Sequence, residues 1–226
     1  IQEGILFSTA AHCLQGLEDN SYFFQGNSNY PLRCIQHPTY NSTQDYKYDI
    51  AACLLEGYIS GMTTEICNLD YETVENNEEN YDGQIFGLGN TGDNGFCSSN
   101  TAGYRHSALF NLGSITSLMN NDIFFIYYNS TNPSLNYYVC KGDSGGALIL
   151  NTTNLSCQWG VVSHGYPNSK GQHYLDGFPI FDTERTSDFN CMEQQLTSNN
   201  CNLFSSSIIN EPTFNPSSNP TAVPSS

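Results

Sequence analysis

The chain has 226 residues, a length that suits one domain or two small ones sharing a core. Its 22 acidic and 6 basic side chains give a formal net charge of −16, which repels the phosphates of nucleic acid and of anionic lipids. No apolar run approaches the roughly 20 residues of a membrane-spanning helix, so we expect neither nucleic-acid binding nor membrane insertion.

The chain up to about residue 200 is predicted to be all-β with one C-terminal helix. Short apolar runs alternate with Gly, Asn and Pro, a pattern typical of a barrel or a sandwich. The expected strands are, in chain order, Ser21–Gln25, Leu32–Gln36, Ile50–Leu55, Gln84–Leu88, Ile123–Tyr128, Gly146–Leu150, Gln158–Ser163 and Phe178–Phe181. The helix is expected over Glu184–Leu196, where Phe189, Met192 and Leu196 fall near helical spacing.

An acidic stretch interrupts the strand pattern between Asp70 and Asp82. It carries six carboxylates: Asp70, Glu72, Glu75, Glu78, Glu79 and Asp82. Clustered carboxylates suit a calcium ion, but their spacing matches no EF-hand loop. A solvated connecting loop is therefore the favoured interpretation, and calcium binding the alternative.

The composition changes after Ser205. Proline recurs every fourth residue among Ser, Thr and Asn, at Pro212, Pro216, Pro220 and Pro224. Such a segment buries too little apolar surface to offset the entropy lost on ordering. We therefore expect residues 1–200 to form the folded domain and residues 205–226 a disordered tail or linker.

Cysteine content and glycosylation sequons indicate a secreted, extracellular protein. Nine cysteines are many for this length and suggest disulfides formed in an oxidising compartment, with at least one thiol unpaired. Asn-x-Ser/Thr sequons, which fit a secreted glycoprotein, occur at Asn41, Asn129, Asn151 and Asn154. The chain begins at Ile1 without a signal peptide, so we expect that an upstream segment is missing.

The stretch Lys141–Gly146 places Ser144 between glycines, which suits a nucleophile. Small neighbours let the backbone turn sharply, so the N–H groups of Gly142 and Ser144 can point at one spot and stabilise an oxyanion. The alternative is an ordinary glycine-rich turn.

A serine nucleophile needs a base at neutral pH. His12, in the stretch Thr9–Cys13, is the candidate base, and Asp49, which opens an apolar strand, is the candidate carboxylate that holds its tautomer. Taken alone, His12 would more often be structural than catalytic, and Asp49 could be a strand-end carboxylate facing water.

These stretches resemble the trypsin/chymotrypsin-like serine proteases, peptidase family S1. The matching motifs are Thr9–Cys13, His37–Asn41, Asp49–Ala51 and Gly142–Gly146, and the order His, Asp, Ser is also that family's order. Weaker matches are Gly87–Gly92, Ser163–Gly165 and Gly177–Thr183. The resemblance runs from about Ile5 to Leu196. It implies two six-stranded antiparallel β-barrels, with the catalytic residues in the cleft between them, and a closing C-terminal helix.

The resemblance also implies a serine endopeptidase that hydrolyses protein or peptide substrates through an acyl-enzyme, with no cofactor and no metal. Ser144 would attack the scissile carbonyl, His12 would transfer the proton, and Asp49 would orient His12. The N–H groups of Gly142 and Ser144 would form the oxyanion hole. The substrate backbone would be aligned by Ser163, His164 and Gly165.

The N-terminus and the primary pocket depart from the family pattern. In the family, a processed Ile or Val terminus pairs with the aspartate before the serine, here Asp143, in an activation salt bridge. Ile1 lies too few residues before His12 for the intervening strands, so we interpret the first strands, and the family partners of Asp143 and Cys13, as missing from this chain. Tyr138 stands at the floor of the primary pocket, where trypsin has an aspartate, so we expect preference for small or apolar side chains.

The resemblance leaves the cysteines partly unassigned. The family pairs the equivalent of Cys140 with a loop after Gly165, which lacks a cysteine here. Its partner is then Cys97 or Cys157, unless it stays free. Further expected pairs are Cys34 with Cys53 and Cys191 with Cys201. Cys67 resembles a position that tethers a propeptide.

His164 stands where the family has tryptophan. A zinc site with another histidine is one interpretation, but no ligand spacing supports it, and a substrate-facing side chain is favoured. His164, Tyr138 and the absent cysteine also favour an alternative function, a catalytically inactive protease-fold binding module. Hydrolysis of a small ester is a third possibility. Because the triad and the motif glycines are all present, the endopeptidase is the leading hypothesis.

Overall fold

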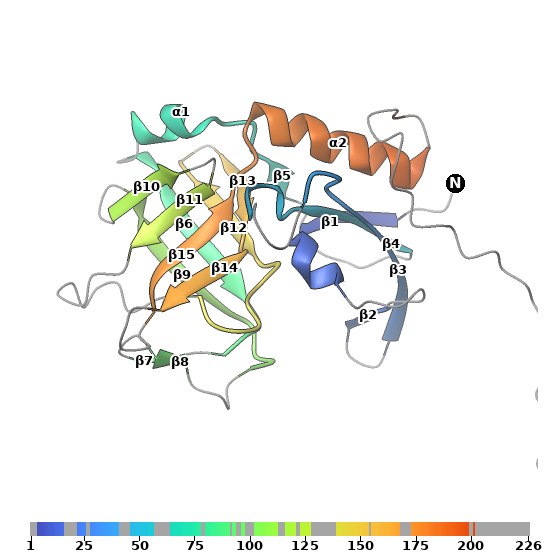
Figure 1. Ribbon diagram of the computed structural model, residues 1–226, viewed down its shortest axis with the longest axis horizontal. Coiled ribbons are helices and arrows are strands. Elements are labelled where there is room, and N and C mark those ends of the chain that lie inside the picture. The colour runs from blue at the N-terminus through green and yellow to red at the C-terminus, as the bar shows by residue number, and fades with distance from the viewer. Residues whose placement is uncertain are drawn as a thin grey trace, which may run out of the picture.

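The computed structural model describes residues 4–15, 22–25, 28–40, 46–56, 64–77, 80–90, 92–93, 96–97, 102–112, 116–120, 123–127, 139–153, 155–167, 173–198 and 201. Figure 1 shows these residues as two groups of strands, with one long helix beside the N-terminal group. Tyr138, the sequons at Asn41, Asn129 and Asn154, and the predicted tail lie outside the described residues.

The N-terminal group is a four-stranded antiparallel sheet in the order β1-β4-β3-β2. Its strands are β1 (Gly4–Thr9), β2 (Tyr22–Gln25), β3 (Ser28–Gln36) and β4 (Ala51–Glu56). The central strand β4 is buried on both faces and reads as an unbroken apolar run, which explains why the sequence predicts it well. Two short 3-10 helices, η1 (Ala11–Leu14) and η2 (Tyr46–Tyr48), lie at the end of β1 and before β4.

The second group contains two larger sheets. One has the order β5-β13-β12-β6-β9 and the other β10-β11-β15-β14, while an isolated bridge between Gly160 and Ile180 joins them. A separate two-stranded ladder pairs β7 with β8. The strands are β5 (Glu65–Ile66), β6 (Asp82–Gly87), β7 (Gly92–Asp93), β8 (Phe96–Cys97), β9 (His106–Asn111), β10 (Thr116–Asn120), β11 (Ile123–Tyr127), β12 (Ala147–Asn151), β13 (Ser156–Val161), β14 (His164–Pro167) and β15 (His173–Pro179).

The predicted all-β fold with a C-terminal helix is confirmed, with one difference in detail. β5 pairs with β13 in parallel, whereas antiparallel pairing was expected throughout. The pairing register shifts inside β12–β13 and β14–β15, and such irregularities bend strands.

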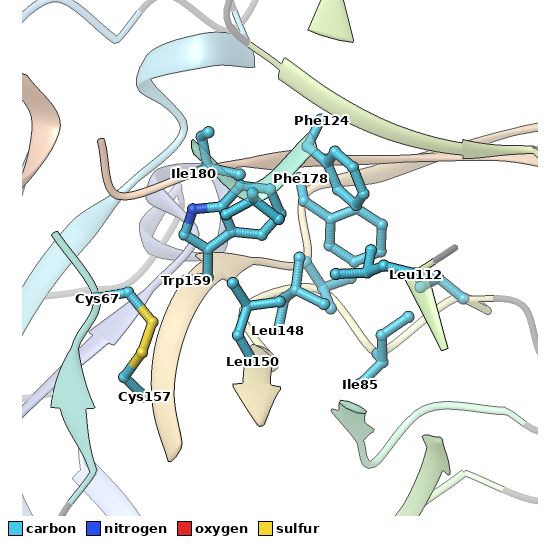
Figure 2. Close-up of a cluster of buried hydrophobic side chains, with 13 residues drawn as sticks. Cys67, Ile85, Leu112, Phe124, Leu148, Leu150, Cys157, Trp159, Phe178 and Ile180 are labelled. Atoms are coloured by element: carbon cyan, nitrogen blue, oxygen red, sulfur yellow. A yellow bond between two sulfur atoms is a disulfide. The ribbon is translucent and has the colours of Figure 1, made fainter. Parts of the chain in front are cut away.

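The core of the second group is centred on Trp159 of β13, whose side chain is fully buried. Figure 2 shows the indole among the rings of Phe124 and Phe178, with Leu148 and Leu150 of β12 beneath it. The Trp159 Nε1–H donates to the carbonyl of Leu69 at 2.8 Å, so the one polar atom of the ring is satisfied.

The C-terminal helix α2 (Thr183–Thr197) covers the N-terminal sheet. Its buried residues Phe189, Met192 and Leu196 pack in one cluster with Ile50 and Leu54 around β4. Each such side chain contributes about 1.5–3 kcal/mol on burial. Asp182 caps the helix by accepting from Arg185 N at 2.9 Å. The helix expected over Glu184–Leu196 is therefore confirmed to within one residue at each end.

Four disulfides join Cys34 with Cys53, Cys67 with Cys157, Cys97 with Cys140, and Cys191 with Cys201. The pairs expected for Cys34 and for Cys191 are confirmed, and Cys97 is the partner of Cys140. Cys13 is free. The expectation that Cys67 tethers a propeptide is wrong, because parallel pairing of β5 with β13 brings its Cα within 5.2 Å of Cys157 Cα.

The acidic stretch is partly structured rather than only a solvated loop. It forms the short helix α1 (Tyr71–Glu75), and Asp70 accepts from both the N–H and the hydroxyl of Thr183 at 3.2 Å. Among the described residues, no three His, Cys, Asp or Glu side chains lie close enough together to hold a metal ion. None of the described helices is long and apolar enough to cross a membrane.

Candidate active site

Asp49 is a fully buried carboxylate at the start of β4, directly after η2. Its Oδ1 accepts from the backbone N–H of His12 at 2.7 Å, and its Oδ2 accepts from His12 Nδ1 at 2.6 Å. Ser163 Oγ donates to the same Oδ2 at 2.5 Å. Three donors compensate the loss of hydration, so the charge of this carboxylate can persist inside the protein.

His12 lies on η1 with its side chain 30 % exposed. Because the Asp49 carboxylate only accepts hydrogen bonds, Nδ1 carries a proton, and the neutral form of the ring therefore has its lone pair on Nε2. The hydrogen bond to Asp49 raises the pKa of His12 above 6.5, and the neighbouring Cys13 thiol adds to this, while burial opposes it. Cys13 Sγ lies 3.7 Å from Nε2. A neutral ring with its proton on Nδ1 is the tautomer that a general base requires.

Ser144 sits in a tight loop whose glycines have left-handed backbone. Gly142 has φ of 98° and Gly145 has φ of 83°, a region that costs other residues steric strain. A Cβ on Gly145 would clash with Thr9 Oγ1 and lie 3.4 Å from Cys13 Sγ. The serine loop therefore packs directly on the segment that carries His12.

The Ser144 hydroxyl does not yet engage the histidine. Its Oγ donates to the carbonyl oxygen of Ser163 at 3.3 Å. In the described part of the chain, no hydrogen bond joins Ser144 Oγ to His12 Nε2. The structure therefore brings His12 and Asp49 together and places Ser144 on the neighbouring loop, with its hydroxyl turned aside.

Two backbone donors of the serine loop are available. Turn bonds run from Asp143 N to Cys140 O at 3.0 Å and from Gly146 N to Asp143 O at 2.9 Å. Within the described residues, no backbone carbonyl accepts from the N–H of Gly142 or Ser144. These are the two donors that the sequence predicts for an oxyanion hole.

The segment Ser163–Gly165 links the His12–Asp49 pair to the edge strand β14. Ser163 donates to Asp49 and therefore accepts from His164 Nδ1, 2.9 Å away. Burial lowers the pKa of His164 to about 4, so this ring is neutral at neutral pH. The Tyr46 ring lies 4.1 Å from the ring of His164, centroid to centroid. His164 therefore extends the hydrogen-bonded chain through Ser163 to Asp49.

Asp143, the residue expected in an activation salt bridge, is 4 % exposed and has a partner within the chain. His106 Nε2 lies 3.0 Å from its Oδ1. His106 was not among the predicted site residues, because it lies in β9, a strand that the sequence analysis did not predict. The sequence analysis also missed Asp176, a second buried acid, which accepts from Val139 N at 2.7 Å. The presence of an acidic residue inside an apolar strand could have revealed it.

An all-β protein in which a buried aspartate holds a histidine beside a glycine-flanked serine has the layout of a serine hydrolase. The family model for trypsin matches residues 1–181, which is most of the chain, so the chain belongs to the trypsin family. Among curated proteins, no sequence matches it. Trypsin-like proteases act on protein substrates, and trypsin-like domains with several disulfides are typically extracellular.

Proposed function

We propose that the protein is a secreted serine endopeptidase that cleaves peptide bonds through an acyl-enzyme, with His12, Asp49 and Ser144 as its triad. The observation that carries this proposal is the 2.6 Å hydrogen bond between His12 Nδ1 and buried Asp49. This bond leaves Nε2 as the free base beside the loop of Ser144. Membership of the trypsin family supports the same reaction class.

Acylation begins when the Ser144 hydroxyl turns from Ser163 O toward His12 Nε2. The oxygen attacks the carbonyl carbon of the scissile bond while its proton passes to His12. The carbonyl oxygen becomes an oxyanion, which the N–H groups of Gly142 and Ser144 stabilise. Asp49 stays ionised and stabilises the imidazolium that has formed.

Collapse of the tetrahedral intermediate breaks the C–N bond, and His12 gives its proton to the departing amine. The acyl group is now an ester of Ser144. A water molecule attacks this ester with His12 as base, and the second tetrahedral intermediate releases the carboxylic acid and restores the serine. No cofactor is needed for either half-reaction.

The substrate backbone is held along the segment Ser163–Gly165. β14 is an edge strand, since only β15 pairs with it among the described residues. An edge strand presents unpaired N–H and C=O groups, which an extended peptide can use by adding a strand. Tyr138 cannot neutralise a cationic side chain, so small or apolar side chains are the proposed preference at the primary pocket.

The proposal is tested by treating the full-length protein with a fluorophosphonate and measuring its intact mass. We expect one adduct on the wild type and none on Ser144→Ala. Ser107→Ala, which removes an exposed hydroxyl that accepts from Gln84 Nε2, is the matched control and should label normally. Folded wild-type protein without an adduct would contradict the proposal.

A protease-fold binding module is the second candidate. The observation that favours it is the Ser144 hydroxyl, which donates to Ser163 O and not to His12. A binding module would remain unlabelled in the same experiment while its thermal unfolding stayed cooperative.

A further inference from the structure

The carboxylate that precedes the nucleophile is held by three donors, all from within the chain. Asp143 Oδ1 accepts from Gly89 N at 2.7 Å and faces His106 Nε2 at 3.0 Å. Its Oδ2 accepts from Cys140 N at 2.9 Å. Both oxygens of Asp143 therefore accept from backbone N–H groups, and the side chain, 4 % exposed, is shielded from water, where a charged partner stabilises a carboxylate most.

His106 is the side chain beside Asp143 that can carry a positive charge. Its Nε2 lies 3.0 Å from the Asp143 carboxyl group and its Nδ1 lies 3.0 Å from the carbonyl oxygen of Tyr104. A doubly protonated imidazolium would donate to both neighbours at once. The His106 side chain is 28 % exposed.

The strand pair β6–β9 is shaped to hold the side chains of His106 and Asp143. The pairing register sets Gly87 of β6 directly opposite His106 of β9. A Cβ on Gly87 would coincide with the Asp143 carboxylate and lie 3.1 Å from His106 Nε2. A Cβ on Gly89 would come within 2.6 Å of Asp143 N. The absence of side chains at both glycines thus makes room for the carboxylate and its partner.

We propose that His106 is the internal counter-ion of Asp143, and through it a positioning residue for the oxyanion loop of Gly142 and Ser144. The inference rests on the proposed serine endopeptidase and concerns how its site is kept assembled.

The path from His106 to the reacting atoms is short. Asp143 bonds Cys140 twice, through Oδ2 to Cys140 N and through its own N–H to Cys140 O. The disulfide between Cys97 and Cys140 holds the other end of this turn. Without the imidazolium, the buried Asp143 carboxylate is uncompensated, and turning it toward water displaces the N–H groups of its neighbours Gly142 and Ser144.

The test compares His106→Gln with His106→Lys in the full-length protein. Glutamine can still donate a hydrogen bond to Asp143 but carries no charge, whereas lysine restores the charge. We expect His106→Gln to lower kcat on a peptide substrate by about 100-fold with little change in KM, as removal of an oxyanion-hole donor does. His106→Lys should recover most of that loss. An unchanged kcat in His106→Gln, or equal losses in both folded variants, would overturn the proposal.

His37→Gln is the matched control for losing a histidine–aspartate pair. His37 Nε2 lies 2.9 Å from Asp188 Oδ2 on α2, a pair of similar length whose partner lies outside the serine loop. This variant is expected to unfold at a lower temperature while its kcat stays unchanged. A loss of kcat matching that of His106→Gln would show that general destabilisation explains both, and would contradict a positioning role.

A further measurement separates this inference from the proposed function. Nitrogen NMR of the folded Ser144→Ala protein, which needs no activity, should show protons on both ring nitrogens of His106; a neutral ring would overturn the inference even if the wild type is active. If the wild type does not label although His106 is doubly protonated, the proposed endopeptidase function is wrong and the proposed ion pair between His106 and Asp143 is still supported.

Discussion

Ser163 donates its hydroxyl proton to the buried Asp49 at 2.5 Å, on the same oxygen that accepts from His12. Two donors on one carboxylate oxygen fix its orientation more firmly than one donor could. The hydroxyl also accepts from His164, so it cannot turn away from Asp49 without breaking two hydrogen bonds. The geometry of the His12–Asp49 pair is thus fixed by Ser163, next to β14, as well as by the position of Asp49, next to β4.

Ser163→Ala should therefore destabilise the fold. It leaves Asp49 with two donors and removes the acceptor of His164 Nδ1, and an unsatisfied buried group costs about 1–3 kcal/mol. Urea unfolding of the variant measures this loss directly. The exposed substitution Ser107→Ala should stay within about 0.5 kcal/mol of the wild type. Equal stabilities for the two variants would contradict the role of the Ser163 hydroxyl.

Asp49→Asn should abolish most of the proposed activity without unfolding the protein. An amide offers a donor to His12 Nδ1, which favours the wrong tautomer, and in this type of site the rate falls about 10⁴-fold. The labelling rate with a fluorophosphonate checks this. Asp188→Asn changes the other histidine–aspartate pair, at His37, and should label at the wild-type rate.

The labelling rate should rise with pH through a midpoint above 6.5. Only neutral His12 can take the proton of Ser144, and the hydrogen bond to Asp49 raises the pKa of His12. The linked stability has the opposite trend, because the pair stabilises the fold fully below pH 6.5 and less as pH rises through the folded-state pKa. A rate profile measured over pH 5–10 with a midpoint at or below 6.5 would contradict this assignment.

Loss of the disulfide between Cys67 and Cys157 should lower the free energy of unfolding more than loss of the disulfide between Cys191 and Cys201. The first spans 90 residues and the second 10. In the chain-entropy model, removing them costs about 4–5 and about 2–3 kcal/mol respectively. Paired alanine substitutions, followed by urea unfolding, measure both values. A larger loss for the shorter loop would show that chain entropy does not control these effects.

Short motifs made much of the candidate site predictable from sequence. Thr9–Cys13 and Asp49–Ala51 are local patterns, and they led to the His12–Asp49 pair that the structure contains. The helix α2 and the strand β4 were also clear, because the apolar residues of α2 follow the helical period and those of β4 form a short continuous run.

Other features depend on contacts between distant segments and could not be predicted. The partner of Cys67 is set by the two-residue strand β5, which is too short to leave a pattern. His106 reaches Asp143 because the register of β6–β9 places it opposite Gly87, and register follows from the whole sheet. The hydroxyl direction of Ser144 likewise depends on Ser163, 19 residues later.

The packing of α2 on the N-terminal sheet has a consequence for synthesis of the chain. Phe189, Met192 and Leu196 share one buried cluster with Ile50 and Leu54 and complete its core. They are translated some 140 residues after Ile50 and Leu54. A nascent chain that has just released β4 from the ribosome still has its apolar face open. Folding of the first half must therefore wait for the last helix, and a chain that stalls before residue 189 presents that face to chaperones or to other chains.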